Sequence, residues 1–201
     1  MKKLRYILLF VPFCLFGQTT EITTSNIHEA VRQWFEKQDD AVETYGPISE
    51  WDVSGVTNMS DLFKNRTNFN EDLSEWKVSK VEDMSGMFAG ASKFKCDLSG
   101  WKVENVRSMM GMFWRAETFN SELSNWKVAK VEDMSFMFWN TKSFTSDLSN
   151  WKVAKVEDMF GMFDQSGMTP IDKCATQKGF LASLGKKGKQ VWPYHDDWNC
   201  D

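Results

Sequence analysis

The sequence is poor in the residues from which most active sites are built. It has only two histidines, His28 and His195, and both lie outside the part of the chain that repeats. No nucleophile elbow, phosphate-binding loop or zinc-ligand spacing is present. We therefore expect a protein that is not an enzyme, that needs no cofactor and that binds no metal ion.

Long hydrophobic runs and an excess of basic charge are also missing. Residues 6–16 form an apolar run that follows three basic residues and is too short to span a bilayer. This pattern predicts a signal peptide over residues 1–17, cleaved after Gly17, with lipidation of Cys14 as the alternative. Loss of the three basic residues would leave 21 basic against 28 acidic side chains. We expect a secreted or surface-attached protein, and we do not expect nucleic acid as its main partner.

What the sequence has instead is a repeat of 25 residues. Each copy contains a tryptophan, valines two and five residues later, a methionine, and then a Met-Phe or Leu-Phe pair, without insertion or deletion. The tryptophans are Trp51, Trp76, Trp101, Trp126 and Trp151. A fixed period of this size is typical of stacked repeats, because one copy cannot bury its own apolar face. With the tryptophans, we expect Met84, Phe88, Met134 and Phe138 to form the core.

Each copy predicts one turn of a coil. The Trp-x-Val segment alternates, as in a short strand whose Trp and Val side chains face inward. From Val81 to Ala91 the apolar residues recur every three or four positions, which indicates a short helix or a run of tight turns. Glycines such as Gly86 would make that helix irregular. The sequence therefore predicts an α/β solenoid with a parallel sheet of short strands and short irregular helices.

Segments without the repeat flank the coil. Residues 18–50 predict a polar lead-in and a helical N-terminal cap, since Ile27, Ala30, Val31 and Trp34 lie on one helical face. Residues 51–163 would hold the five repeats, the last one partial. Residues 164–201 begin with a turn-rich stretch and would form a C-terminal cap, because a stack needs closed ends.

Three cysteines remain after the predicted signal. Cys174 and Cys200 bracket the C-terminal cap, and a disulfide between them would stabilise an exported protein by about 3 kcal/mol. The alternative is a metal site formed with His195 and Asp196, although the spacing matches no compact zinc pattern. Cys96 stands where other copies have glutamate or serine, so we expect it to be exposed and unpaired.

Part of the repeat resembles a known family. The frame L-x-x-W-x-V-x-x-V has the spacing of a leucine-rich-repeat strand, with valine at the last place. The segments V-E-D-M-S-G-M-F (81–88) and F-N-E-D-L-S-E-W (69–76) resemble the repeat of BspA-like leucine-rich-repeat surface proteins, also seen in mycoplasma-type lipoproteins. The resemblance covers about residues 45–165. It implies a right-handed coil without catalytic residues, on a secreted or surface-attached protein of a family in which some members are adhesins and the ligand of most members is unknown.

Two columns of charge recur on the predicted surface. The first column is a candidate ligand face, for example for an anionic polymer, and consists of Lys77, Lys102, Lys127 and Lys152. The second is acidic and consists of Asp72, Asp97, Glu122 and Asp147. Mutual neutralisation of the columns is the alternative to a ligand surface. The acidic residues could also hold the local turn through their side chains.

The repeat, the signal and the missing catalytic residues favour a non-catalytic binding module of the adhesion type. Its partner would be an extracellular protein or glycan, and we expect a monomer without a transmembrane span. A structural envelope or spacer protein without a specific ligand is the alternative. An extracellular hydrolase, with Asp and His of the tail as an acid–base pair, is a remote one.

Overall fold

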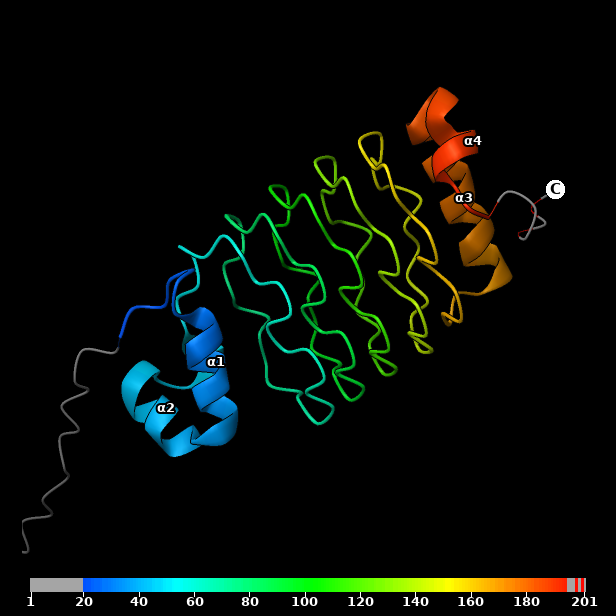
Figure 1. Ribbon diagram of the computed structural model, residues 1–201. Helices are drawn as coiled ribbons and strands as arrows, with labels where there is room; N and C mark the ends of the chain where they lie inside the picture. Colours follow the sequence, from blue (N-terminus) through cyan, green and yellow to red (C-terminus); the bar gives the residue numbers. More distant parts are fainter. Residues whose placement is uncertain (1–19, 195–197, 199, 201) are drawn as a thin grey trace, which may run out of the picture.

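A computed structural model describes residues 20–194, Trp198 and Cys200 of the chain. The predicted signal over residues 1–17 lies outside these residues. Figure 1 shows the repeats as successive turns, stacked side by side between a helical pair at one end and further helices at the other. Each described helix is too short or too polar to cross a lipid bilayer.

The regular elements lie at the two ends of the stack. Before the repeats come helices α1 (Ile27–Glu36) and α2 (Gln38–Tyr45) and the 3-10 turn η1 (Ile48–Glu50). After them come α3 (Pro170–Leu184), η2 (Gly185–Lys187) and α4 (Gly188–Val191). The first turn is covered by α1, whose Trp34 ring meets Trp51 edge to face at 6.1 Å. Phe35 lies in the same way against Phe69, at 5.6 Å.

The predicted α/β solenoid with a parallel sheet is wrong, because residues 20–194 contain no β-strand. The Trp-x-Val segment lies between two tight turns, closed by Trp76 N–H to Leu73 O and by Val81 N–H to Val78 O. Leu73 O also accepts a hydrogen bond from the Trp101 indole of the next turn, at 3.0 Å. This carbonyl is therefore engaged by two donors, neither of which belongs to a strand ladder.

The segment expected to be an irregular helix is a run of tight turns. Alternate amides, those of Met84, Gly86, Phe88 and Gly90, donate to carbonyls of the next turn. The amides of Met87 and Ala89 instead donate to carbonyls three residues earlier in the same turn. Only isolated parallel bridges result, one per pair of turns, such as that between Asp83 and Ser108. The backbone hydrogen bonds are thus satisfied without a helix or a sheet.

The core consists of columns of rings that run along the stack. Phe88, Phe113 and Phe138 lie parallel at 5.7 Å from one turn to the next. Within a turn, Phe88 also stacks on Phe94 at 4.0 Å. The side chains expected in the core are at most 4% exposed: Trp51, Trp76, Trp101, Trp126, Trp151, Met84, Phe88, Met134 and Phe138. Burial of large rings in every turn gives the hydrophobic stabilisation that no single turn could supply.

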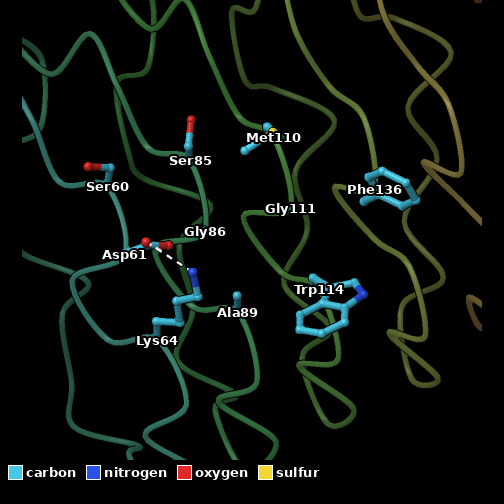
Figure 2. A pocket seen from close by; sticks show the side chains of 10 residues that line it. All are labelled: Ser60, Asp61, Lys64, Ser85, Gly86, Ala89, Met110, Gly111, Trp114 and Phe136. Carbon is cyan, nitrogen blue, oxygen red and sulfur yellow. Dashed lines mark hydrogen bonds and ion pairs between the residues drawn. The ribbon is translucent and has the colours of Figure 1, made fainter.

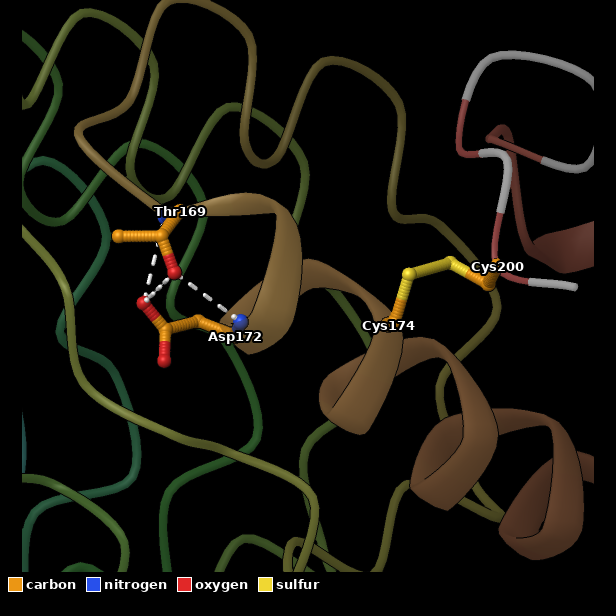
Figure 3. The surroundings of a disulfide bond; sticks show 4 residues. All are labelled: Thr169, Asp172, Cys174 and Cys200. Atoms are coloured by element: carbon orange, nitrogen blue, oxygen red, sulfur yellow. Dashed lines mark hydrogen bonds between the residues drawn. A yellow bond between two sulfur atoms is a disulfide. The ribbon is translucent and has the colours of Figure 1, made fainter.

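The C-terminal end is closed by α3 and by the residues after it. A capping box between Thr169 and Asp172 begins the helix, and a disulfide joins Cys174 to Cys200 (Figure 3). The predicted disulfide is therefore confirmed. The ring of Phe180 stacks on Trp151 at 6.4 Å, and the ring of Trp198 lies 5.6 Å from Phe163. These rings cover the apolar face that the last turn would otherwise expose.

Candidate functional site

The lysine row lies on the surface of the stack, with one lysine between the Trp and the Val of each Trp-x-Val segment. Lys77, Lys102, Lys127 and Lys152 are all exposed. None of the four forms an ion pair with another described residue. Ion pairing between the lysine and acidic columns is therefore not seen in the described part of the chain.

The acidic column has a local structural role instead. Asp72 and Asp97 each accept the backbone N–H two residues later, from Ser74 at 3.0 Å and from Ser99 at 2.9 Å. Glu122 and Asp147 make the same contact with Ser124 and Ser149. The backbone hydrogen bond from Ser99 holds the pKa of Asp97 below its ordinary value. The interpretation that these residues hold the turn is confirmed, which weakens their case as ligands.

Cys96 is half-buried, so the prediction that it is exposed is wrong. Its Sγ lies 3.2 Å from the Leu73 amide, which donates to it. Ser121 Oγ accepts from the Leu98 amide in the corresponding place, at 2.9 Å. This position binds the neighbouring turn, which draws its side chain inward, and burial raises the pKa of the Cys96 thiol to about 11. The remaining prediction, that Cys96 is unpaired, is confirmed.

No described cluster of three or more His, Cys, Asp and Glu side chains is placed to bind a metal ion. Of the metal site considered as an alternative to the disulfide, Cys174 and Cys200 are joined to each other. His195 and Asp196 lie outside the described residues.

A groove opens on a second face, along the run of tight turns. It holds about 420 Å³ and extends from the first turn to the fourth. Figure 2 shows that the residues lining it form three rows along the stack. The first row is Ser60, Ser85 and Met110, the middle row is Asp61, Gly86, Gly111 and Phe136, and the third row is Lys64, Ala89 and Trp114. The Asp61 and Lys64 side chains pair at 3.0 Å at one end, and aromatic rings form the other. We call this feature the glycine-floored groove.

Glycines open the groove because each turn presents one left-handed residue in the middle row. At Gly111 the nearest atom that an added Cβ would meet is Trp114 Cβ, at 3.7 Å, so the space above it is free. At Gly86 a Cβ would lie 2.1 Å from a carboxylate oxygen of Asp61, whose side chain leans over it. The floor thus consists of backbone, which lets a ligand approach closely.

Apolar side chains at the far end of the groove are exposed to solvent. Met110, Phe136 and Phe160 are 46%, 38% and 63% exposed. Trp114 stacks on Trp139 at 5.7 Å, and both are partly exposed. The guanidinium of Arg115 lies 5.1 Å from the Trp114 ring centroid. These residues form one apolar patch beside and within the groove.

The repeat explains nearly all of the Trp, Phe and Met residues, so the sequence did not predict this patch. The signal that could have found it is departure from the repeat. Where Met110 and Phe160 stand, the other turns have Ser60, Ser85 and Ser135. Where Trp114 and Trp139 stand, other turns have Lys64, Ala89 and Asp164. An apolar residue at a position that is polar or small in other turns is the mark of a surface with a separate role.

Two overlapping stretches, residues 29–142 and 75–172, match the model of a family described as "Mycoplasma protein of unknown function, DUF285". The chain belongs to this family. The resemblance to the mycoplasma-type repeat is therefore confirmed, whereas the finer assignment to BspA-like leucine-rich-repeat proteins is not. Comparison with curated proteins and with solved structures finds no match.

The DUF285 family is described as having no known function, so only the residues of the groove indicate what this site can bind. Its only charged side chains, Asp61 and Lys64, are exposed and paired with each other. The rest of the lining is glycine, alanine, serine and large apolar side chains. This arrangement can bind an apolar group and fix its orientation at one end, as ligand grooves commonly do.

Proposed function

We propose that this DUF285 protein is a non-catalytic binding module, and that the glycine-floored groove binds a segment of an extracellular protein. The observation that carries the proposal is the exposed ring of Phe136 in left-handed backbone, at φ +55°. A bulky residue there is strained, and its exposed ring gains little hydrophobic free energy. Such a costly residue is best explained by a contact with something outside the chain.

The composition of the patch favours a protein as the partner. Exposed apolar patches with polar rims mark interaction surfaces. Aromatic residues, methionine and arginine are enriched in protein interfaces, and tryptophan and arginine are enriched among the residues that dominate affinity. The patch combines Met110, Trp114, Phe136 and Arg115 in this way. The expected ligand inserts an apolar side chain over Gly111, between the rings.

Secretion or attachment to the cell surface is part of the same proposal, as is the relation to BspA-like surface proteins. Both rest on the sequence, through the predicted signal over residues 1–17 and the form of the repeat. An adhesion-type protein needs both an exported chain and a surface that binds. The glycine-floored groove is the candidate for the surface that binds.

The test replaces the apolar residues of the groove by the residues that the second turn carries at the same repeat positions. The variant Met110→Ser/Trp114→Ala/Phe136→Gly copies Ser85, Ala89 and Gly86 of the second turn, so it should fold. Binding of the chain without residues 1–17 to a panel of purified extracellular matrix proteins is measured by surface plasmon resonance. We expect wild type to bind at least one of them, and the variant to bind it at least about tenfold more weakly.

The matched control is Ile171→Ser, which removes an apolar side chain that is 81% exposed but lies outside the groove. It should bind as wild type does. Equal affinity of the groove variant and wild type, or no binding by wild type, would contradict the proposal. Sedimentation velocity reports a further outcome: if wild type dimerises and the groove variant does not, the groove binds a second copy and not a partner protein.

A further inference from the structure

The lysine row is part of a wider basic edge in the last two turns. Lys127 and Lys152 are followed three residues later by Lys130 and Lys155, and all four are exposed. Between the lysines of each pair lie a buried valine and one exposed uncharged residue, which is Ala129 or Ala154. No ion pair with a described residue involves any of these four lysines.

The fold adds a basic run from a distant part of the chain. The Val153 amide donates to Ser183 Oγ near the end of α3, at 2.8 Å. The helix packs so closely on the last turn that a Cβ at Gly179 would lie 2.0 Å from Ser149 O. Figure 1 shows α3 alongside that turn. Lys186 and Lys187 follow in η2 and are exposed, so they extend the same edge.

The acidic residues do not cancel this charge evenly. In the first turns, Glu50, Asp52 and Glu75 share the edge with Lys77 and Lys80. Asp52 has a lowered pKa, caused first by its hydrogen bond with Ser54 and to a lesser degree by Lys77 and Lys80. The corresponding places in the fourth and fifth turns carry Asn125, Lys127, Asn150 and Lys152. Ala129 and Ala154 stand where the third turn has Glu104, so the last two turns carry no acidic residue in these columns.

The edge is also hollowed along the stack. A hollow of about 590 Å³ is lined by Lys77, Lys80 and Lys102 and by one acidic residue, Glu75. A second hollow, of about 300 Å³, is lined by Lys102 and Lys127 and by one acidic residue, Glu104. The two hollows share Gly100, and a Cβ there would meet no atom within 4 Å. The two hollows are therefore neighbours along the stack, and the second ends at Lys127, the first lysine of the fourth turn.

We propose that this basic edge binds a linear polysaccharide that carries sulfate or carboxylate groups, independently of the glycine-floored groove. Lysines repeated once per turn suit a polymer with charges at regular intervals. The indole rings behind the edge, Trp126 and Trp151, are 3% and 1% exposed. They cannot stack on bases, which single-stranded nucleic acids require. Exposed Asn125 and Asn150 can bond to sugar hydroxyls.

The experiment measures binding of the chain without residues 1–17 to heparin and to hyaluronate, with neutral dextran as the uncharged probe. Wild type should bind a charged polysaccharide and not dextran, with an affinity that falls as salt is raised. The variant Lys127→Gln/Lys130→Gln/Lys152→Gln/Lys155→Gln should bind more than tenfold more weakly, since each lysine contributes roughly fivefold near an anionic surface. Its dependence on salt should be shallower by about one unit per lysine.

Two further variants locate the effect. Lys186→Gln/Lys187→Gln should also weaken binding, because α3 brings these lysines to the edge. Lys93→Gln/Lys95→Gln removes two exposed lysines elsewhere and should change affinity less than about twofold. The groove variant should bind polysaccharide as wild type does, so failure of one proposal leaves the other testable.

Three results would overturn the inference. The first is no binding of either charged polysaccharide, and the second is unchanged binding by the four-lysine variant with a native near-ultraviolet circular dichroism spectrum. The third is tighter lysine-dependent binding to single-stranded oligothymidylate or to phosphatidylcholine vesicles containing phosphatidylserine. That result would assign the edge to another class of partner.

Discussion

Phe136 occupies a backbone conformation that the corresponding place of other turns gives to aspartate or glycine. The residues at that place in the other turns are Asp61, Gly86, Gly111 and Gly161, and their φ angles lie between +54° and +63°. The Phe136 ring leans over Gly161, where a Cβ would approach it to 2.8 Å. Left-handed backbone costs a residue with a side chain about 1–2 kcal/mol. Glycine follows in the next turn because the ring needs its space.

At the residue scale, Phe136→Gly should leave the free energy of unfolding within about 1 kcal/mol of wild type. Relief of the backbone strain offsets the lost ring contact with Phe160 and the added entropy of glycine in the unfolded chain. Phe138→Ala, two residues on and fully buried, should cost about 3–5 kcal/mol because it leaves a cavity. Urea titration measures both, and similar losses would refute the view that Phe136 contributes little to folding.

At the scale of the single turn, the acidic residues before Leu-Ser in the first three such places, Asp72, Asp97 and Glu122, each bond to their own turn and to the next. Asp97 Oδ1 accepts the Ser99 amide, and it also accepts the hydroxyl of Ser121 from the next turn at 2.8 Å. Ser121 Oγ in turn accepts the Leu98 amide. Asp72, Cys96 and the Leu73 amide form the corresponding set one turn earlier, with sulfur in place of the hydroxyl.

These contacts predict how stability depends on pH. The pKa of Asp97 is lowered, chiefly by the Ser99 amide and then by Ser121, so its carboxylate stabilises the fold above the unfolded value of about 3.9. That stabilisation is lost as pH falls through the folded pKa. Asp97→Asn keeps an acceptor but does not titrate, so we expect its deficit in Tm at pH 7 to shrink below about pH 4. A deficit that stays constant down to pH 2.5 would show that the charge has no such role.

At the scale of the whole molecule, each turn contacts chiefly its two neighbours. The Trp101 indole donates to Leu73 O one turn before, and the Trp126 indole donates to Leu98 O. The rings of Phe113 and Phe138 stack in the same sense, turn on turn. Stability in such a stack is roughly a sum over units and the interfaces between them.

Deletion of residues 76–100 tests this description, because Glu75 would then precede Trp101 in unchanged register. We expect the shortened chain to fold, with a lower urea midpoint and a smaller m value, since less surface is buried. Deletion of residues 76–87 removes about half a period and should prevent folding, because it shifts every ring out of its column. The expectation would be contradicted if both shortened chains gave a native near-ultraviolet circular dichroism spectrum, or if neither of them did.

The sequence by itself determined which positions of the repeat form the core, because the 25-residue period and the hydrophobicity of each position are visible without coordinates. It also indicated the helix at the N-terminal end and the pairing of Cys174 with Cys200, but not the helices α3 and α4. It could not decide between strand and turn, since the Leu73 carbonyl is engaged by an indole 28 residues away. Exposure of Cys96 was misjudged for the same reason: its partner lies in the neighbouring turn.

Only the tertiary structure decided the surfaces. The glycine-floored groove exists because Asp61, Gly86, Gly111 and Phe136, each 25 residues apart, become neighbours in one row. The basic edge gains Lys186 and Lys187 because Ser183 bonds to the last turn. Burial depends on each residue's own hydrophobicity, whereas a binding surface depends on which residues of different turns and helices meet, and that is settled by packing.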